Sequence, residues 1–198
     1  SEFFYWENSE NTLNVGRSNE ITNTIYSIIT GEDNTINNSS RSSVHGYNNS
    51  ASNSNYSGIF EGNNNTISEG SNSVILGGLY NSISFSEQSS ILCGSGNTLT
   101  SSNHSSIIAS KDVDISKLTN SAIIASNDTT INSVNNNVSI ISASGISSVN
   151  DYTLYTFNLD ASNIISSSIS SSTMNTTNLS ATTIYCTDLY TSALTLHI

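Results

Sequence analysis

The sequence predicts an all-β fold: a parallel β-solenoid with coils of about 16 residues, followed by a shorter repeat of five residues. Three observations support this fold class. A glycine-anchored motif recurs every 15 or 16 residues, apolar residues recur at fixed positions within it, and the apolar period changes to five past Gly145. A helical fold is excluded because no 3.6-residue period persists, and Asn, Ser, Thr and Ile are weak or mediocre helix formers.

Residues 1–11 precede the repeats and carry the aromatic run Phe3–Trp6. The end of a solenoid exposes an unpaired strand edge, which natural proteins cover. We therefore expect an N-terminal cap on the first coil. Sugar stacking, or docking to a preceding domain, is the alternative interpretation of these aromatic residues.

Residues 12–148 contain the first repeat, whose anchors follow one another at steps of 15, 15 and then 16 residues. The anchors are Gly16, Gly31, Gly46, Gly62, Gly78, Gly94, Ser110 and Ser126. A segment of this length holds two short strands and two turns, which is too little to bury its own apolar side chains. Stacked copies bury one continuous column, and each backbone pairs with the coils above and below.

Glycine and asparagine mark the expected turns of each coil. Glycine at the anchor tolerates the positive φ of a tight corner, and Asn is the next most tolerant residue. An Asn follows three residues after most anchors, so stacked coils would bring these side chains into one hydrogen-bonded ladder. The predicted turn residues include Gly31, Gly46, Gly62, Gly78, Gly94, Asn34, Asn65 and Asn97.

Two adjacent apolar residues precede most anchors, as in Ile28–Ile29 and Ile123–Ile124. Neighbours on a strand point to opposite faces, so one enters the coil and the other points outward. An outward apolar stripe many coils long implies a partner surface, most simply identical copies around an axis. A bulged strand that turns both side chains inward is the alternative. The residues two before the anchor are the candidate interface or core positions: Ile29, Val44, Phe60, Leu76, Leu92, Ile108 and Ile124.

The segment Ser89–Leu99, SSILCGSGNTL, resembles the head repeats of trimeric autotransporter adhesins, and similar repeats occur in phage and giant-virus fibre proteins. The resemblance covers about residues 12–146. It implies a left-handed parallel β-roll in a homotrimer, and it transfers no catalytic or ligand-binding residue. The adhesin pattern has small residues, often Ala, where this chain has Asn and Ile.

Residues 149–198 carry the pentad repeat, with an apolar residue at every fifth position from Leu154 to Leu194. The pattern resembles two architectures: the square β-helix of pentapeptide-repeat proteins, and the intertwined trimeric stalk of viral fibres. The stalk is favoured because it continues a trimeric roll. Candidate interface or core residues here are Leu159, Ile164, Ile169, Leu179 and Ile184.

Composition excludes several functional classes. The chain has 198 residues, a formal net charge of −11 and only four Lys or Arg. Too few cations are present to neutralise nucleic-acid phosphates or to attract anionic lipid. No apolar run approaches the ~20 residues of a transmembrane helix. We therefore expect neither nucleic-acid binding nor membrane insertion.

No catalytic, metal or cofactor site is predicted. The carboxylates fall on turns or near the terminus, and none forms the loop of six or more oxygens that calcium requires. His45, His104 and His197 occupy variable or terminal positions. Cys93 and Cys186 form no metal-binding spacing and are expected to be buried free thiols.

These expectations combine into a non-enzymatic, elongated homotrimer at a virion or cell surface, outside the cell, with a host glycan or receptor as a further partner. The leading alternative is a monomeric β-solenoid that binds ice or a glycan on one flat face. A third alternative is a glycan-degrading solenoid enzyme, which would need a carboxylate cluster on adjacent coils.

Overall fold

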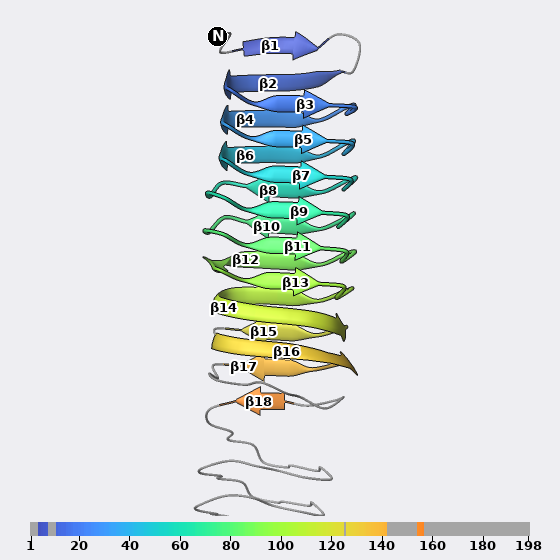
Figure 1. Ribbon diagram of the computed structural model, residues 1–198, viewed down its shortest axis with the longest axis vertical. Helices are drawn as coiled ribbons and strands as arrows, with labels where there is room; N and C mark the ends of the chain where they lie inside the picture. Colours follow the sequence, from blue (N-terminus) through green and yellow to red (C-terminus); the bar gives the residue numbers. More distant parts are fainter. Residues whose placement is uncertain (1–3, 8–10, 125, 142–153, 157–198) are drawn as a thin grey trace, which may run out of the picture. The chain divides into compact units, whose positions relative to one another are not determined.

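The computed structural model describes residues 4–7, 11–124, 126–141 and 154–156. Contact clustering separates the chain into Ser1–Tyr155 and Thr156–Ile198, and the description below concerns the first unit. Every regular element in the described residues is a β-strand, as predicted. The strands form a parallel β-solenoid of about eight turns, in which two stacks of strands run side by side (Figure 1).

The first strand stack contains the strands that precede or include the anchor of each coil. Successive members pair in parallel, from Leu13 opposite Ile28 at one end to Ile123 opposite Ile140 at the other. Its strands are β2 (Thr12–Arg17), β4 (Ile28–Glu32), β6 (Ser43–Tyr47), β8 (Gly58–Phe60), β10 (Val74–Leu76), β12 (Ser90–Ser95), the beginning of β14 (Ser106–Thr119), β15 (Ala122–Ile124) and β17 (Ser139–Ile141).

The second strand stack lies one corner further along each coil. Its pairing is also parallel, as in Ile67 opposite Ile83 and Ile83 opposite Leu99. Its strands are β3 (Glu20–Thr22), β5 (Thr35–Asn37), β7 (Ser50–Ser52), β9 (Thr66–Ser68), β11 (Ser82–Ser84), β13 (Thr98–Thr100), the end of β14 and β16 (Asn127–Asn136). We call the bend from the first stack to the second the glycine corner, and the bend back the return turn.

Two short strands lie outside this alternation. β1 (Phe4–Glu7) pairs antiparallel with β2, with Phe4 opposite Val15 and Glu7 opposite Thr12. It therefore occupies the backbone edge of the first coil, at the top of the stack in Figure 1. β18 (Leu154–Thr156) is the last described strand.

The core consists of two facing columns of apolar side chains, each contributing one residue per coil. Every member is at most 1% exposed. The first stack provides Ile29, Val44, Ile59, Ile75, Ile91, Ile107, Ile123 and Ile140, and the second provides Ile36, Ala51, Ile67, Ile83, Leu99, Ile115 and Ile131. Branched apolar side chains suit this pleated, fully buried position.

The predicted Asn ladder is present at the glycine corner. The Asn65 side chain accepts a hydrogen bond from the main-chain N–H of Asn81, at 3.0 Å. It also donates to the Gly78 carbonyl in the following coil, at 3.0 Å. The same pattern links Asn34 with Asn49 and continues until Val113 takes the place of Asn.

Two buried serine positions in each return turn do the same at the other end of the coil. Ser89, for example, accepts from the Ser105 main-chain N–H and donates to the Ser102 carbonyl. Within the described residues, every buried side-chain nitrogen or oxygen has a hydrogen-bond partner. The polar interior is therefore satisfied coil by coil, which removes the main cost of burying it.

Coil length changes once in this series, and the change lies at the glycine corner. Val44 pairs with Ile59, fifteen residues later, but Tyr47 pairs with Asn63, sixteen later. The extra residue in each 16-residue coil sits between the core position and the anchor glycine, and it has a positive φ. These residues are Glu61, Gly77, Cys93 and Ala109, with φ between 49° and 73°.

This insertion corrects the strand alignment obtained by counting back from the glycines. Ile29 and Val44 are buried core residues, aligned with Ile59 and Ile75. Phe60 and Leu76, which share their spacing from the anchor, point outward. The position two before the anchor is thus one sequence column but two structural columns.

Candidate interaction surfaces

An apolar column runs along the outer face of the first strand stack. It consists of Phe60, Leu76, Leu92, Ile108, Ile124 and Ile141, and this set is called the apolar column below. Phe60, Leu76 and Ile141 are 43%, 41% and 39% exposed, and the other three are half-buried. Successive members are one strand spacing apart, ~4.8 Å, so the column is about 24 Å long.

A column of smaller side chains lies beside the apolar column, two residues earlier on each strand. Its members are Gly58, Val74, Ser90, Ser106, Ala122 and Ser139. Neither column contains a charged residue, although the chain carries a net charge of −11. The outer face of the 16-residue coils is therefore a neutral ridge next to a shallow step.

The same face changes character in the 15-residue coils. The column that continues the ridge there contains Val15, Thr30 and His45. His45 Nδ1 lies 2.7 Å from the Thr30 hydroxyl, and its ring stacks on Phe60 with centroids 5.5 Å apart. His45 thus joins its neighbours above and below and has no arrangement suited to catalysis.

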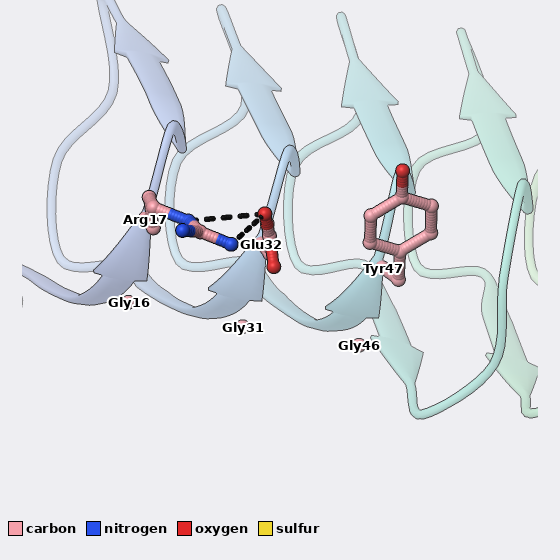
Figure 2. A pocket seen from close by; sticks show the side chains of 6 residues that line it. All are labelled: Gly16, Arg17, Gly31, Glu32, Gly46 and Tyr47. Atoms are coloured by element: carbon pink, nitrogen blue, oxygen red, sulfur yellow. Dashed lines mark hydrogen bonds and ion pairs between the residues drawn. The ribbon is translucent and has the colours of Figure 1, made fainter.

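The glycine corners carry a mixed surface. Arg17 and Glu32, in successive coils, form an ion pair of 2.5 Å, and Tyr47 follows in the next coil (Figure 2). These three side chains and the glycines beside them line a shallow, open depression. Further along, Leu79 and Tyr80 are 46% and 65% exposed. The Arg17–Glu32 pair consumes the charge of both groups, so the depression offers no free ion.

The return turns of the first three coils carry an aromatic ladder that sequence reasoning missed. The Arg41 guanidinium lies 5.4 Å from the ring centroids of both Tyr26 and Tyr56. The three residues are fifteen apart, so their common column could have been read from the sequence. Phe85, an exposed aromatic residue, occupies a later return turn.

The outer face of the second strand stack is polar and made of small side chains. Two positions per strand face outward, as in Ser82 and Ser84 on β11 or Thr98 and Thr100 on β13. Hydroxyl groups in neighbouring coils contact each other, with Ser84 and Thr100 at 3.2 Å. The first of these two positions also includes Glu20 and Asp114, so the hydroxyl pattern is interrupted at both ends.

The other predicted residues fall as follows. Gly31, Gly46, Gly62, Gly78 and Gly94 have φ between 94° and 111°, and Asn34, Asn65 and Asn97 are buried in the ladder. The pentad residues Leu159, Ile164, Ile169, Leu179 and Ile184 lie outside the described residues. The expectation of buried thiols is wrong for Cys93, which is exposed at the corner beside Leu92.

Searches for metal sites and membrane spans were limited to the part of the chain that the structure describes. There, no three His, Cys, Asp or Glu side chains come together in a group that could hold a metal ion. The same residues include no helix with the length and apolar character of a membrane span. No protein-family model and no curated protein matches the chain.

Proposed function

We propose that this protein is a structural fibre or adhesin subunit, which assembles as a homotrimeric rod on a virion or cell surface and takes part in host attachment. The apolar column is the observation that carries the proposal. A column of six large apolar side chains on a rigid backbone is a partner surface, because such patches on soluble monomers promote aggregation.

A second copy of the same chain is the occupant that fits best. The column is straight and repeats at the strand spacing, so an identical column related by rotation about a parallel axis meets it with the same period. The absence of charge on both outer columns matters as well. Chains with a charge of −11 can approach along this face without placing carboxylates opposite one another.

The small column beside the ridge supports the same assembly. Gly58, Ser90 and Ser106 leave space next to Phe60, Leu92 and Ile108. In an arrangement of three chains, the ridge of one copy packs into the step of the next. The resemblance of the repeat to trimeric adhesin heads favours three copies over two, and a left-handed coil within each.

The mechanical role follows from the bonding within the coils. Parallel ladders join each strand to both neighbours, and the Asn and Ser ladders add side-chain bonds between consecutive coils. No part of such a stack opens without breaking bonds to the next coil. A rod of this kind holds a distal element away from the surface that carries it.

Mass in solution tests the assembly. One chain has a mass of 21.0 kDa, so light scattering after size exclusion should report about 63 kDa for a trimer. Leu76→Asp and Ile108→Asp should each shift the mass toward the monomer, because a desolvated charge in the apolar column opposes packing. Thr98→Asp, on the opposite face, is the matched control and should leave the mass unchanged.

Two outcomes would contradict the proposal: a wild-type mass near that of one chain, or Asp variants that keep the trimeric mass. Circular dichroism of each variant separates failed assembly from failed folding. Ile108→Ser, which adds no charge, provides a second variant should Ile108→Asp not fold.

A monomeric solenoid that binds ligands on a flat face is the second candidate. The paired hydroxyl columns of the second strand stack favour it, since they present donors and acceptors at a regular spacing. The two functions make opposite predictions for the mass measurement. They also differ in the critical face, because Ser82 and Thr98 would then matter and Leu76 would not.

A further inference from the structure

The return turns of the first three coils hold a cation in a fixed position. Tyr26 and Tyr56 place their rings on either side of Arg41, each with its centroid 5.4 Å from the guanidinium carbon. Stacking covers the faces of a guanidinium and leaves its N–H groups, which lie in the plane, at the edges. Aromatic faces also restrict the rotamers of an arginine that would otherwise be free.

The Arg41 side chain has no anion of its own in the protein. Among the residues that the structure describes, it forms neither an ion pair nor a side-chain hydrogen bond, whereas Arg17 and Lys111 each pair with a carboxylate. The return turns of these three coils, residues 23–27, 38–42 and 53–57, contain no Asp or Glu. In a chain of net charge −11, this edge is locally positive.

The backbone at these positions is unusual for the residues that occupy it. Tyr26, Arg41 and Tyr56 have φ of 56°, 57° and 58°, in the left-handed region. Later coils place Asn72, Asn120 and Asn137 at the same point of the turn, the residue that tolerates this conformation best. Large side chains in the left-handed region carry a conformational cost, and such a cost is typical of positions kept for function.

We propose that Arg41, with Tyr26 and Tyr56, forms a binding site for the carboxylate of an acidic sugar. The guanidinium edge matches a carboxylate in a two-point hydrogen bond. The two tyrosines are half exposed or more, at 56% and 58%, so their hydroxyls and ring edges remain available to the rest of the sugar. They lie two coils apart, roughly 10 Å, a span that a disaccharide covers.

This inference deepens the attachment part of the proposed function by naming a ligand class. The site lies within one chain and on a different edge from the apolar column. A failure to bind acidic sugars would therefore leave the mass measurements, and the trimer, unaffected. In a trimer the three copies of the site would bind a glycan-covered surface with increased avidity.

Titration of the ¹⁵N-labelled protein with sugars, followed by NMR, tests the site. The probes are 3′-sialyllactose, a disaccharide ending in glucuronic acid, and lactose as the neutral match. We expect the two acidic probes to bind in about the millimolar range, and lactose at least tenfold more weakly. Comparing the two acidic probes identifies which acidic sugar is preferred.

Arg41→Gln should remove binding of the acidic probes, and Arg41→Lys should weaken it severalfold, because a lysine keeps the charge but loses the planar donor edge. Lys117→Gln is the matched control: Lys117 is an exposed cation in a later return turn, also at positive φ, and its loss should leave binding unchanged. Tyr26→Ala and Tyr56→Ala should each weaken binding while thermal unfolding reports any loss of stability.

Three results would overturn the proposal. They are the absence of binding by wild-type protein, equal binding of lactose and 3′-sialyllactose, and equal losses in Arg41→Gln and Lys117→Gln. The last would indicate general electrostatic attraction without a defined site.

Discussion

Adjacent glycines at positions 77 and 78 both have positive φ, of 73° and 95°, but their surroundings differ. A Cβ added to Gly78 would lie 2.2 Å from the Gly94 carbonyl oxygen, whereas one added to Gly77 would meet nothing closer than 3.8 Å. The anchor glycine is thus required by the next coil, and the inserted residue is limited only by its own backbone. Glu61, Cys93 and Ala109 at the equivalent place show the same freedom.

The pair Gly77→Ala and Gly78→Ala should separate these two effects. Gly77→Ala should cost about 1 kcal/mol, the penalty of a left-handed alanine. Gly78→Ala should cost on the order of 4 kcal/mol, because the corner must also move away from the neighbouring coil. Denaturant unfolding of both variants measures the difference, and similar losses would contradict the close-packed corner.

Asn81 shows how much one buried amide contributes. Its side chain accepts from the Asn97 main-chain N–H at 3.1 Å and donates to the Gly94 carbonyl at 3.1 Å. Asn81→Ala should reduce the free energy of unfolding by about 2–4 kcal/mol, since two buried groups lose their partners. Ser82→Ala, at the next residue but facing outward, should change it by less than about 0.5 kcal/mol.

A loss for Asn81→Ala no larger than that for Ser82→Ala would show that water replaces the amide in the ladder. Chemical denaturation at equilibrium provides both values under the same conditions.

At the scale of the coil, the inserted residue separates two interchangeable lengths. Ile75–Leu76 followed directly by Gly78 would reproduce the arrangement Val44–His45–Gly46 of a 15-residue coil. Deleting Gly77 should therefore give a folded protein that loses about 1–3 kcal/mol, the usual range for a single substitution. The loss reflects the mismatch with the two flanking 16-residue corners.

Deletion of Ser82 is the contrasting experiment. It lies within β11, so its loss would turn Ile83 from the core to the outer face, a one-residue slip that reverses the strand. We expect a far larger loss of stability, or no folded protein. Circular dichroism and thermal unfolding distinguish the two deletions, and equal tolerance would contradict the in-and-out assignment.

Much of this architecture could be predicted from the sequence, because its determinants repeat. The recurrence of Gly, Asn and Ile at fixed steps predicted parallel coils, positive φ at the anchors and the ladder through Asn34 and Asn65. The strand register could not be predicted by counting from the glycines. The insertion lies between core residue and glycine, so Ile29 and Phe60 share a spacing but not a face.

The surfaces were less predictable, for a physical reason. Outward positions are not constrained by the next coil, so the repeat does not mark them. The ladder of Tyr26, Arg41 and Tyr56 depends on three residues meeting in space, and only the 15-residue step between them hints at it.

At the scale of the whole stack, bonding joins each coil only to its two neighbours. Stability in such repeats is close to a sum of coil and interface terms, and opening starts from the ends. Hydrogen exchange followed by mass spectrometry should show the greatest protection in the middle coils, around Ile75 and Ile91, and progressively less toward Leu13 and Ile140. Uniform exchange along residues 12–141 would instead indicate a single cooperative unit.

The ladders of Asn and Ser carry one more consequence. Because each coil offers the same donors and acceptors on its upper and lower sides, a whole 16-residue unit can be duplicated or lost without leaving a group unpaired. Each such event changes the height by one strand spacing, ~4.8 Å. Inheritance can therefore adjust this protein like a ruler cut in fixed graduations, altering reach while leaving both ends as they were.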